Sequence, residues 1–403
     1  MDRPTLGVAM IGYGFMGAAH SQGWRVAPRF FDLPIEPEMS VIVGRDATRV
    51  EAAREKFGWK SASTNWREVL TRDDIQVVDI CTPGDSHVEI AIAALEAGKH
   101  VLCEKPLANT VEEAERMAAA AEKAAERGVQ AMVGFSYRRV PAIGFARQLI
   151  ANGRLGEIRQ VRAQYLQDWL VDADGPMTWR LDKDRAGSGS LGDIGAHAID
   201  MVQYLTGSAL ESVSGTMHTF VTERPLLGET VGLSGTASEE RGQVTVDDAA
   251  WFTARLSSGA IGSFEATRFA TGRKNALRVE ISGSSGALAF DLETMNELQF
   301  YDATDPAGEQ GFKRIIVTEP EHPYMDSWWP TGHAIGYEHA FSHEVRDFVL
   351  DIDAGRAPSP SFADGLQVQR VLDAVERSAG NGSAWTATQT ATTQEDAQMG
   401  NGK

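Results

Sequence analysis

Residues 6–17, which read LGVAMIGYGFMG, decide the fold of this chain. An apolar run of strand type is followed by three glycines in the spacing G-x-G-x-x-G. The first glycine permits a tight turn, the second lets the backbone approach a pyrophosphate, and the third lets the next helix pack against the strand. The amino terminus of that helix offers N–H donors to an anion. The residues expected to contact a dinucleotide here are Gly12, Gly14, Phe15, Met16 and Gly17.

The first third of the chain continues as alternating strands and helices. An α/β Rossmann domain with a doubly wound parallel sheet is the fold that this alternation favours, and we assign it to residues 1–135. The further strands are expected at 40–43, 77–80, 101–103 and 129–135, and the helices at 50–57, 88–97 and 111–127.

The pattern changes after residue 136. Long runs of strand type are joined by short polar turns, which predicts a large, mainly antiparallel open sheet within an α+β domain over residues 136–379. Residues 225–242, rich in Gly, Glu, Ser and Thr, are expected to form a long loop. Residues 380–403 have the composition of a flexible tail. Helices are expected at 140–152 and 191–205.

Composition narrows the class of protein. The 403 residues carry a formal net charge of −18, which argues against a nucleic-acid partner, because phosphate contacts need clustered Lys and Arg. The two cysteines, Cys81 and Cys103, give no disulfide framework. Residues 1–5 show no basic leader with an apolar segment, and no apolar run approaches the ~20 residues of a membrane helix. A cytoplasmic location without membrane contact is therefore expected.

Glu104-Lys105-Pro106 follows a buried strand pattern. Ligands of open α/β sheets bind beyond the carboxyl ends of the strands, so Lys105 is expected in the site, as are Thr82, Pro83 and His87. A neighbouring oxidised nicotinamide and partial burial would favour a neutral lysine amine. Lys105 could then take the proton of a hydroxyl group as hydride leaves the same carbon.

Asp193 and His197 are four residues apart and would share one face of a helix. Asp193 could hold a sugar hydroxyl or orient Lys105, and His197 could bind the reacting oxygen or relay its proton. The alternative is a helix cap with a satisfied core histidine. No metal is assigned, because the histidines show no H-E-x-x-H or paired-cysteine spacing.

The residues at the end of the second strand are expected to determine whether NAD or NADP binds. An acidic residue there binds the ribose 2′-hydroxyl, whereas arginine accommodates a 2′-phosphate. This chain has Gly44-Arg45-Asp46. Arg45 favours NADP and Asp46 could still serve NAD, so the choice stays open.

These motifs, in this order, resemble the glucose-fructose oxidoreductase, inositol dehydrogenase and MocA family. The resemblance covers about residues 5–378 and rests on GYGFMG, TPGDSH, CEKP, SYRR, TWR and GSGSLGDIGAHAID. A closer likeness, to the branch of levoglucosan and glycoside 3-dehydrogenases, rests on YLQDW, SFEATR and SPSFADG. The acidic residue that ends the second strand in that branch is Gly44 here.

The resemblance implies an enzyme that builds homo-oligomers, dimers or tetramers, through its large sheet. The implied catalytic group is Lys105, Asp193 and His197. The implied cofactor contacts are Thr82, His87, Glu104, Trp179 and Arg180, and the implied substrate pocket adds Tyr137, Arg138, Gln167 and Tyr337.

The leading hypothesis is an NAD(P)-dependent dehydrogenase that oxidises a secondary hydroxyl of a sugar, anhydrosugar, glycoside or cyclic polyol, at C3 by the closer likeness. One alternative is a glycoside-cleaving enzyme that recycles a tightly held cofactor through a 3-keto sugar. A second alternative is a non-catalytic dinucleotide sensor, which would have no need of Lys105.

Overall fold

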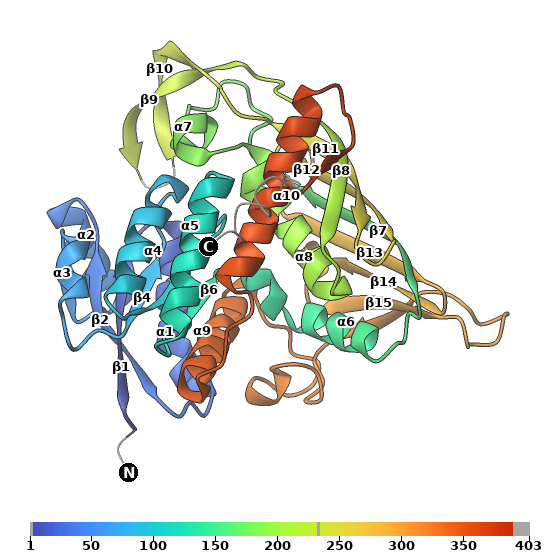
Figure 1. Cartoon of the computed structure of the whole chain (residues 1–403), viewed down its shortest axis with the longest axis horizontal. Helices are drawn as coiled ribbons and strands as arrows, with labels where there is room; N and C mark the ends of the chain where they lie inside the picture. The colour runs from blue at the N-terminus through green and yellow to red at the C-terminus, as the bar shows by residue number, and fades with distance from the viewer. Residues whose placement is uncertain (1–2, 232–233, 390–403) are drawn as a thin grey trace, which may run out of the picture.

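The computed structural model describes residues 3–231 and 234–389. Two separate sheets dominate the fold, one of six strands near the amino terminus and one of nine strands (Figure 1). The predicted combination of a Rossmann sheet and a large, mainly antiparallel sheet is confirmed.

The six-stranded sheet is parallel throughout and has the order β3-β2-β1-β4-β5-β6. Its strands are β1 (Thr5–Ile11), β2 (Glu36–Val43), β3 (Ser61–Ser63), β4 (Val77–Ile80), β5 (His100–Cys103) and β6 (Ala131–Val133). The helices between them are α1 (Phe15–Phe30), α2 (Ala47–Phe57), α3 (Trp66–Leu70), α4 (His87–Glu96) and α5 (Val111–Ala125).

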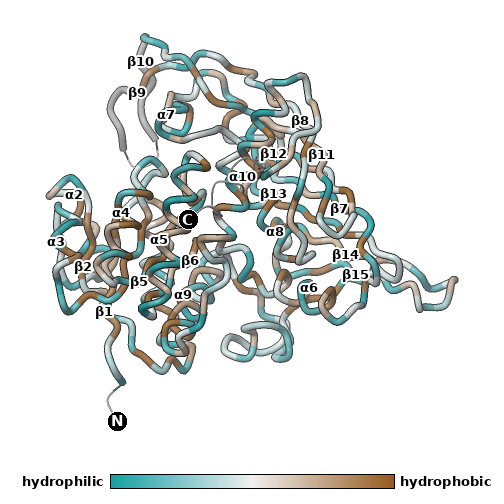
Figure 2. The backbone as a smooth tube through the Cα atoms, in the orientation of Figure 1, coloured by the Kyte–Doolittle hydropathy of each residue, from teal (hydrophilic) through white to brown (hydrophobic). Residues whose placement is uncertain are grey.

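Both faces of this sheet are buried, because successive side chains of a strand point to opposite faces. On one face, Met10 of β1 packs with Trp24 of α1 and Phe348 of α9 (Tyr337–Ala354). On the other face, Ile11 packs with Ile90 of α4. Figure 2 accordingly shows hydrophobic residues along these inner strands and hydrophilic residues on the outer helix surfaces. Continuous apolar strand patterns of this kind are typical of a parallel sheet covered on both sides.

The nine-stranded sheet has the order β16-β15-β14-β13-β7-β12-β11-β8-β17, and its pairs are antiparallel except for β7 with β12. Its strands are β7 (Ile158–Leu166), β8 (Leu210–His218), β11 (Ala249–Leu256), β12 (Ile261–Thr267), β13 (Ala276–Gly283), β14 (Gly286–Asp291), β15 (Glu297–Asp302), β16 (Lys313–Ile316) and β17 (Thr386–Ala387).

Helices cover one face of this sheet, and its other face is polar. The covering helices are α6 (Pro141–Ala151), α8 (Ala196–Thr206) and α10 (Phe362–Gly380). Val161 and Ala163 of β7 are buried beneath them, whereas Arg162 between them is exposed and pairs with Glu280 of β13 at 2.9 Å. The alternation of buried and exposed residues is what an antiparallel sheet with one free face requires.

The last two helices connect the two sheets. Helix α9 (Tyr337–Ala354) packs against α1, and α10 lies between α5 and strand β8 (Figure 1). Carboxy-terminal residues that we assigned to the second domain therefore also cover the first sheet. These two helices fix the position of one sheet relative to the other.

Two expectations are corrected. Residues 225–242 are not a loop: β9 (Glu223–Val231) and β10 (Ser234–Gln243) form an antiparallel hairpin with two register shifts. Pairing between the two segments outweighs their unfavourable composition. The predicted tail begins later than residue 380, because Thr386 and Ala387 pair with the edge strand β8, and the rest of it, 390–403, lies outside the described residues. No helix in the described part of the chain is long and apolar enough to cross a membrane.

Candidate active site

The glycine loop between β1 and α1 has the geometry of a phosphate cradle. Gly12 has φ +107°, and a Cβ atom there would lie 2.7 Å from the carbonyl oxygen of Cys81. A Cβ on Gly17 would lie 2.2 Å from the carbonyl oxygen of Gly12. A Cβ on Gly14, by contrast, would meet nothing within 4 Å. The loop is therefore closed on the strand side and open at Gly14, where a pyrophosphate would lie against the start of α1.

Lys105 and Asp193, 88 residues apart in sequence, are in contact. The Lys105 Nζ donates to the backbone carbonyl of Asp193 at 2.6 Å and lies 3.4 Å from its carboxylate Oδ1. Lys105 comes from the end of β5, and Asp193 from a π-helical turn (Leu191–Gly195) that leads into α8. The predicted convergence of these two side chains is present in the structure.

The π-helical turn is anchored by Asp247. Its Oδ1 accepts from the Gly189 N–H at 2.7 Å, and its Oδ2 accepts from the Ser190 hydroxyl and the Leu191 N–H. A Cβ on Gly189 would lie 1.8 Å from the Asp247 carbonyl oxygen. Glycine at position 189 therefore makes room for the backbone of Asp247.

Asp193 lies among positive charges. The guanidinium of Arg268, which is fully buried at the end of β12, lies 3.6 Å from Asp193 Oδ2. Burial opposes ionisation of the Asp193 carboxyl, but the charges of Lys105, Arg268 and Arg180 together lower its pKa to about 2. Asp193 is therefore ionised throughout the neutral range, and it holds the Lys105 amine in place.

His197 follows one turn later, in an aromatic pocket. Its ring packs against Phe135, Tyr137 and Tyr165, with the Tyr137 centroid 4.7 Å away. Burial, and secondarily the charge of Lys105, lower the pKa of His197 well below its usual value. The imidazole is therefore neutral near pH 7. It can accept or donate one hydrogen bond at each nitrogen according to its tautomer.

Tyr137 and Tyr337 belong to the same aromatic pocket. Their ring centroids are 6.2 Å apart, and Tyr337 also stacks on Phe15 of the glycine loop at 6.2 Å. Because Tyr337 begins α9, this helix links the loop to the residues around His197. Burial raises the pKa of the Tyr137 hydroxyl, which keeps it protonated.

A chain of hydrogen bonds extends from Tyr137 to Gln167. The Tyr137 and Tyr165 hydroxyls are 2.9 Å apart, and Asn275 Oδ1 accepts from both Tyr165 and Gln167 at 2.8 Å. Gln167 Oε1 in turn accepts from the Trp169 indole N–H at 2.8 Å. Gln167 thus shares one polar network with Tyr137.

Glu104 points away from Lys105 into a sealed cluster. Its Oε1 lies 2.9 Å from His20 Nε2, while His20 Nδ1 lies 3.0 Å from both carboxylate oxygens of Asp79. The Trp24 indole N–H also donates to Asp79, at 2.7 Å. Burial opposes protonation of His20, but Asp79 outweighs it and raises the pKa of His20 well above its usual value. His20 is therefore a cation held between two carboxylates.

A metal could be imagined in this cluster, because ligand atoms of His20, Asp79 and Cys81 lie within 4.8 Å of one another. Both nitrogens of His20 are already directed at carboxylates. Burial raises the pKa of the Cys81 thiol, which favours the protonated form rather than the thiolate that binds metals. The cluster is explained by its internal hydrogen bonds.

His87 and Arg138 have their polar atoms engaged elsewhere. His87 is buried, with Nε2 2.9 Å from the Thr82 carbonyl oxygen and Nδ1 3.1 Å from that of Pro106. It ties together the loops that follow β4 and β5. Arg138 donates to both carboxylate oxygens of buried Asp200, at 2.9 and 2.5 Å. We therefore correct the prediction that Arg138 binds substrate, because its charge is used inside the protein.

The remaining predicted cofactor contacts lie in the loop after β4, in a short 3₁₀ helix, at the start of α1 and after β2. Thr82 accepts from the Ser86 hydroxyl at 2.7 Å in the loop that contains Pro83. The Arg180 guanidinium stacks on the Trp179 ring at 4.5 Å. Met16 is half-buried at the start of α1, and Arg45 is exposed beyond β2.

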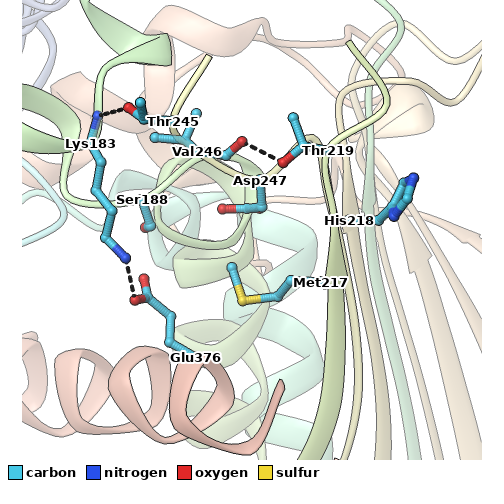
Figure 3. A pocket seen from close by; sticks show the side chains of 9 residues that line it. All are labelled: Lys183, Ser188, Met217, His218, Thr219, Thr245, Val246, Asp247 and Glu376. Carbon is cyan, nitrogen blue, oxygen red and sulfur yellow. Dashed lines mark hydrogen bonds and ion pairs between the residues drawn. The ribbon is translucent and has the colours of Figure 1, made fainter. Parts of the chain in front are cut away.

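A hollow of about 230 Å³ lies beside the Asp247 anchor (Figure 3). At its edge the Lys183 ammonium pairs with Glu376 at 2.8 Å, and the Thr219 hydroxyl donates to the Val246 carbonyl at 2.9 Å. Asp247 is occupied by the π-helical turn. Lys183, Glu376, Thr219, Thr245 and Asp247 all have partners within the protein, so most of the polar lining is engaged structurally.

Sequence reasoning missed Arg268 and Asn275. Arg268 ends the segment SFEATR, which was used only for the family resemblance. An arginine at the end of a strand whose alternate residues are buried could have been recognised as facing the same interior as Asp193. Asn275 lies in a turn and carries no comparable signal.

A Rossmann sheet with an open glycine cradle, facing a lysine and a carboxylate at the joint with a second domain, defines a dinucleotide-dependent oxidoreductase. Two family profiles match the chain: an oxidoreductase family with an NAD-binding Rossmann fold, over residues 6–135, and the GFO/IDH/MocA C-terminal domain, over residues 144–289. The chain belongs to the GFO/IDH/MocA family.

Several relatives resemble it over nearly their whole length. Levoglucosan dehydrogenase of Pseudarthrobacter phenanthrenivorans is 43% identical over 93% of this chain and 96% of its own. Glucose-6-phosphate 3-dehydrogenase of Bacillus subtilis is 27% identical over 91% and 94%. Among solved structures, an oxidoreductase domain protein from Kribbella flavida has a TM-score of 0.92 at 61% identity, covering 96% of this chain and all of its own. A levoglucosan dehydrogenase complex with NADH and levoglucosan has a TM-score of 0.89 at 41% identity, with the same coverage.

Proposed function

We propose that this protein is an NAD(P)-dependent dehydrogenase that oxidises a secondary hydroxyl, at C3, of an anhydrosugar, hexose or glycoside. The observation that carries the proposal is the contact of Lys105 with Asp193 at the joint between the two sheets, beside the glycine cradle. The family and the 43% identity to a levoglucosan dehydrogenase support the class of substrate. The name of the Bacillus subtilis relative, a 3-dehydrogenase, supports the position on the ring.

Each residue of the proposed site has a separate role in the reaction. A bound nicotinamide would supply the acceptor for the hydride of the carbinol carbon. Lys105 takes the proton of the same hydroxyl, so that the products are a keto sugar, a reduced nicotinamide and a protonated lysine. Asp193 stabilises the protonated amine and fixes its position. His197, neutral and buried, can hydrogen-bond the reacting oxygen and orient it. Gln167 and Tyr337 are the proposed substrate contacts.

The free face of the nine-stranded sheet fits the predicted homo-oligomer. It carries a broad open hollow of about 680 Å³, lined by residues that include Arg162, Trp251, Glu265, Arg278 and Glu280. Described helices cover only the opposite face. A second copy would bury this polar and aromatic surface, and a light-scattering mass above one chain would support the assignment.

The experiment is a panel of anhydrosugars, hexoses, glycosides and inositols, followed by the absorbance of reduced nicotinamide. Reduction with levoglucosan or a hexose is expected, and it should be slower when deuterium replaces hydrogen at C3 than at C2 or C4. No reduction with any member, although cofactor binds, would contradict the proposal. Release of an aglycone without net reduction would identify the glycoside-cleaving alternative instead.

A further inference from the structure

With the Tyr13 ring where it lies, the end of β2 has no room for an acidic side chain. Gly44 follows the last residue of β2, and a Cβ atom built on it would lie 1.9 Å from Cε1 and 2.3 Å from Cδ1 of the Tyr13 ring. Tyr13 belongs to the glycine loop itself. The place from which an aspartate or glutamate would reach a ribose 2′-hydroxyl is therefore filled by an aromatic ring.

The next acidic residue along the chain is already used. Asp46 caps helix α2, and its Oδ1 accepts from the Arg49 N–H at 2.9 Å. Its other oxygen lies 3.9 Å from the Arg49 guanidinium. An Asp46 engaged in this way is a poor acceptor for a ribose hydroxyl, and its negative charge is offset by Arg49.

Arg45, between these two residues, is exposed and has no hydrogen bond or ion pair with any residue that the structure describes. Other arginines near this end of the sheet are engaged: Arg54 pairs with Glu51 at 2.7 Å, and Arg67 pairs with Glu89. A free guanidinium beside the adenosine end of a Rossmann site, where an acid is lacking, matches a phosphate monoester.

We propose that this chain selects NADP(H) over NAD(H) by binding the 2′-phosphate with Arg45, in a site whose acidic residue is replaced by Gly44 under the Tyr13 ring. The inference deepens the proposed function by naming its cofactor, and it needs only that a nicotinamide nucleotide binds the glycine loop. A solved levoglucosan dehydrogenase, 41% identical, holds NADH. The two proteins are therefore expected to differ in cofactor while sharing one fold.

Isothermal titration without sugar tests the inference independently of catalysis. NADPH and NADH are titrated into the full-length protein, and then 2′,5′-ADP and 5′-AMP as probes of the adenosine end alone. We expect NADPH to bind about tenfold or more tighter than NADH, the range of a hydrogen bond between charged groups. Arg45→Ala should weaken NADPH and 2′,5′-ADP about tenfold while leaving NADH within twofold.

A matched control removes one positive charge from the far end of α2, the helix that Arg45 precedes. Lys56→Ala, at an exposed position in the last turn of α2, should leave both affinities unchanged. The double variant Tyr13→Ala/Gly44→Asp, which clears the ring and supplies an acid, should reverse the preference. Circular dichroism confirms that each variant is folded.

Three results would overturn the inference: NADH binding at least as tightly as NADPH, Arg45→Ala weakening both nucleotides equally, or Arg45→Ala weakening neither. NADH preference together with sugar oxidation would contradict this inference alone. Tight NADPH binding without oxidation of any sugar would contradict only the proposed function.

Discussion

Glu104 and Lys105 are neighbours in sequence, yet their side chains enter two different polar clusters. Glu104 joins His20 and Asp79 under the parallel sheet, where every member is buried to 4% exposure or less. Lys105 joins Asp193 at the joint between the sheets, where the side chains of the pair keep 13% and 29% of their surface exposed. One strand end therefore supplies a sealed cluster and an accessible one.

The difference distinguishes charged groups that stabilise the fold from charged groups that are placed to take part in the reaction. In the sealed cluster, one cation lies between two carboxylates, so each charged group has a fixed partner. In the accessible cluster the amine is held mainly by a backbone carbonyl, and Asp193 is shared with Arg268. Substitutions in the sealed cluster should therefore lower the free energy of unfolding. Substitutions in the accessible cluster should lower the reaction rate.

The largest effect on stability is expected from His20→Leu. The change removes the cation between Asp79 and Glu104 and leaves two buried carboxylates unpaired, which typically costs about 3 to 5 kcal/mol. A urea titration followed by circular dichroism measures it. His218→Leu, at an exposed position of β8, should change the free energy of unfolding by less than about 0.5 kcal/mol. Equal midpoints for His20→Leu and wild type would remove the distinction between the clusters.

A smaller effect, on rate alone, is expected from Asp193→Asn. The Lys105 amine loses its carboxylate partner, and kcat should fall about 100-fold with little change in the unfolding midpoint. Asp184→Asn, exposed on α7 (Lys183–Ala186), is the matched control. Because the pKa of Asp193 is about 2, its titration should produce no acid limb in the wild-type pH–rate profile between pH 4 and 7. A lower unfolding midpoint without a lower kcat would mean that Asp193 stabilises the fold and does not act in the reaction.

The smallest effect is expected from Glu344→Gln, next to the sealed cluster. Burial raises the pKa of Glu344 to about 8, although His20 and Arg139 oppose this, and its Oε1 has no hydrogen-bond partner among the described residues. A raised carboxyl pKa stabilises the fold below the unfolded pKa near 4.3, and this contribution is lost as pH rises toward 8.

The variant lacks that pH dependence. Its free energy of unfolding relative to that of wild type should therefore rise between pH 5 and pH 8, by on the order of 1 to 3 kcal/mol. Glu338→Gln, on the same helix but with a side chain that is 54% exposed, should show no such trend. A constant difference between Glu344→Gln and wild type would mean that Glu344 is ionised in the folded protein.

The sequence alone predicted the features that depend on hydrophobic periodicity and on the positions of strand ends. Apolar runs before Gly12 and Glu104 located β1 and β5, and strand-end logic placed Lys105 in the site. Helical spacing put Asp193 and His197 one turn apart, although the turn between them is π-helical. These patterns depend on residues that are close in sequence, so the folded structure preserves them.

Other features depended on partners that sequence spacing does not reveal. Arg138 was assigned to substrate, but Asp200, 62 residues away, holds it. The β9–β10 hairpin formed from residues with poor strand propensity, because each segment supplies the other's hydrogen bonds. Tyr13 over Gly44 likewise became visible only when two loops were placed together.

The most direct test of the account is a single turnover of Lys105→Met with bound cofactor and levoglucosan, beside wild type, after nucleotide affinity has been measured for both. The account predicts unchanged nucleotide affinity, an unchanged unfolding midpoint and a rate of reduced nicotinamide formation at least about 1,000-fold lower in the variant. A variant that reduces its cofactor within tenfold of the wild-type rate would show that the proton of the sugar leaves by another route.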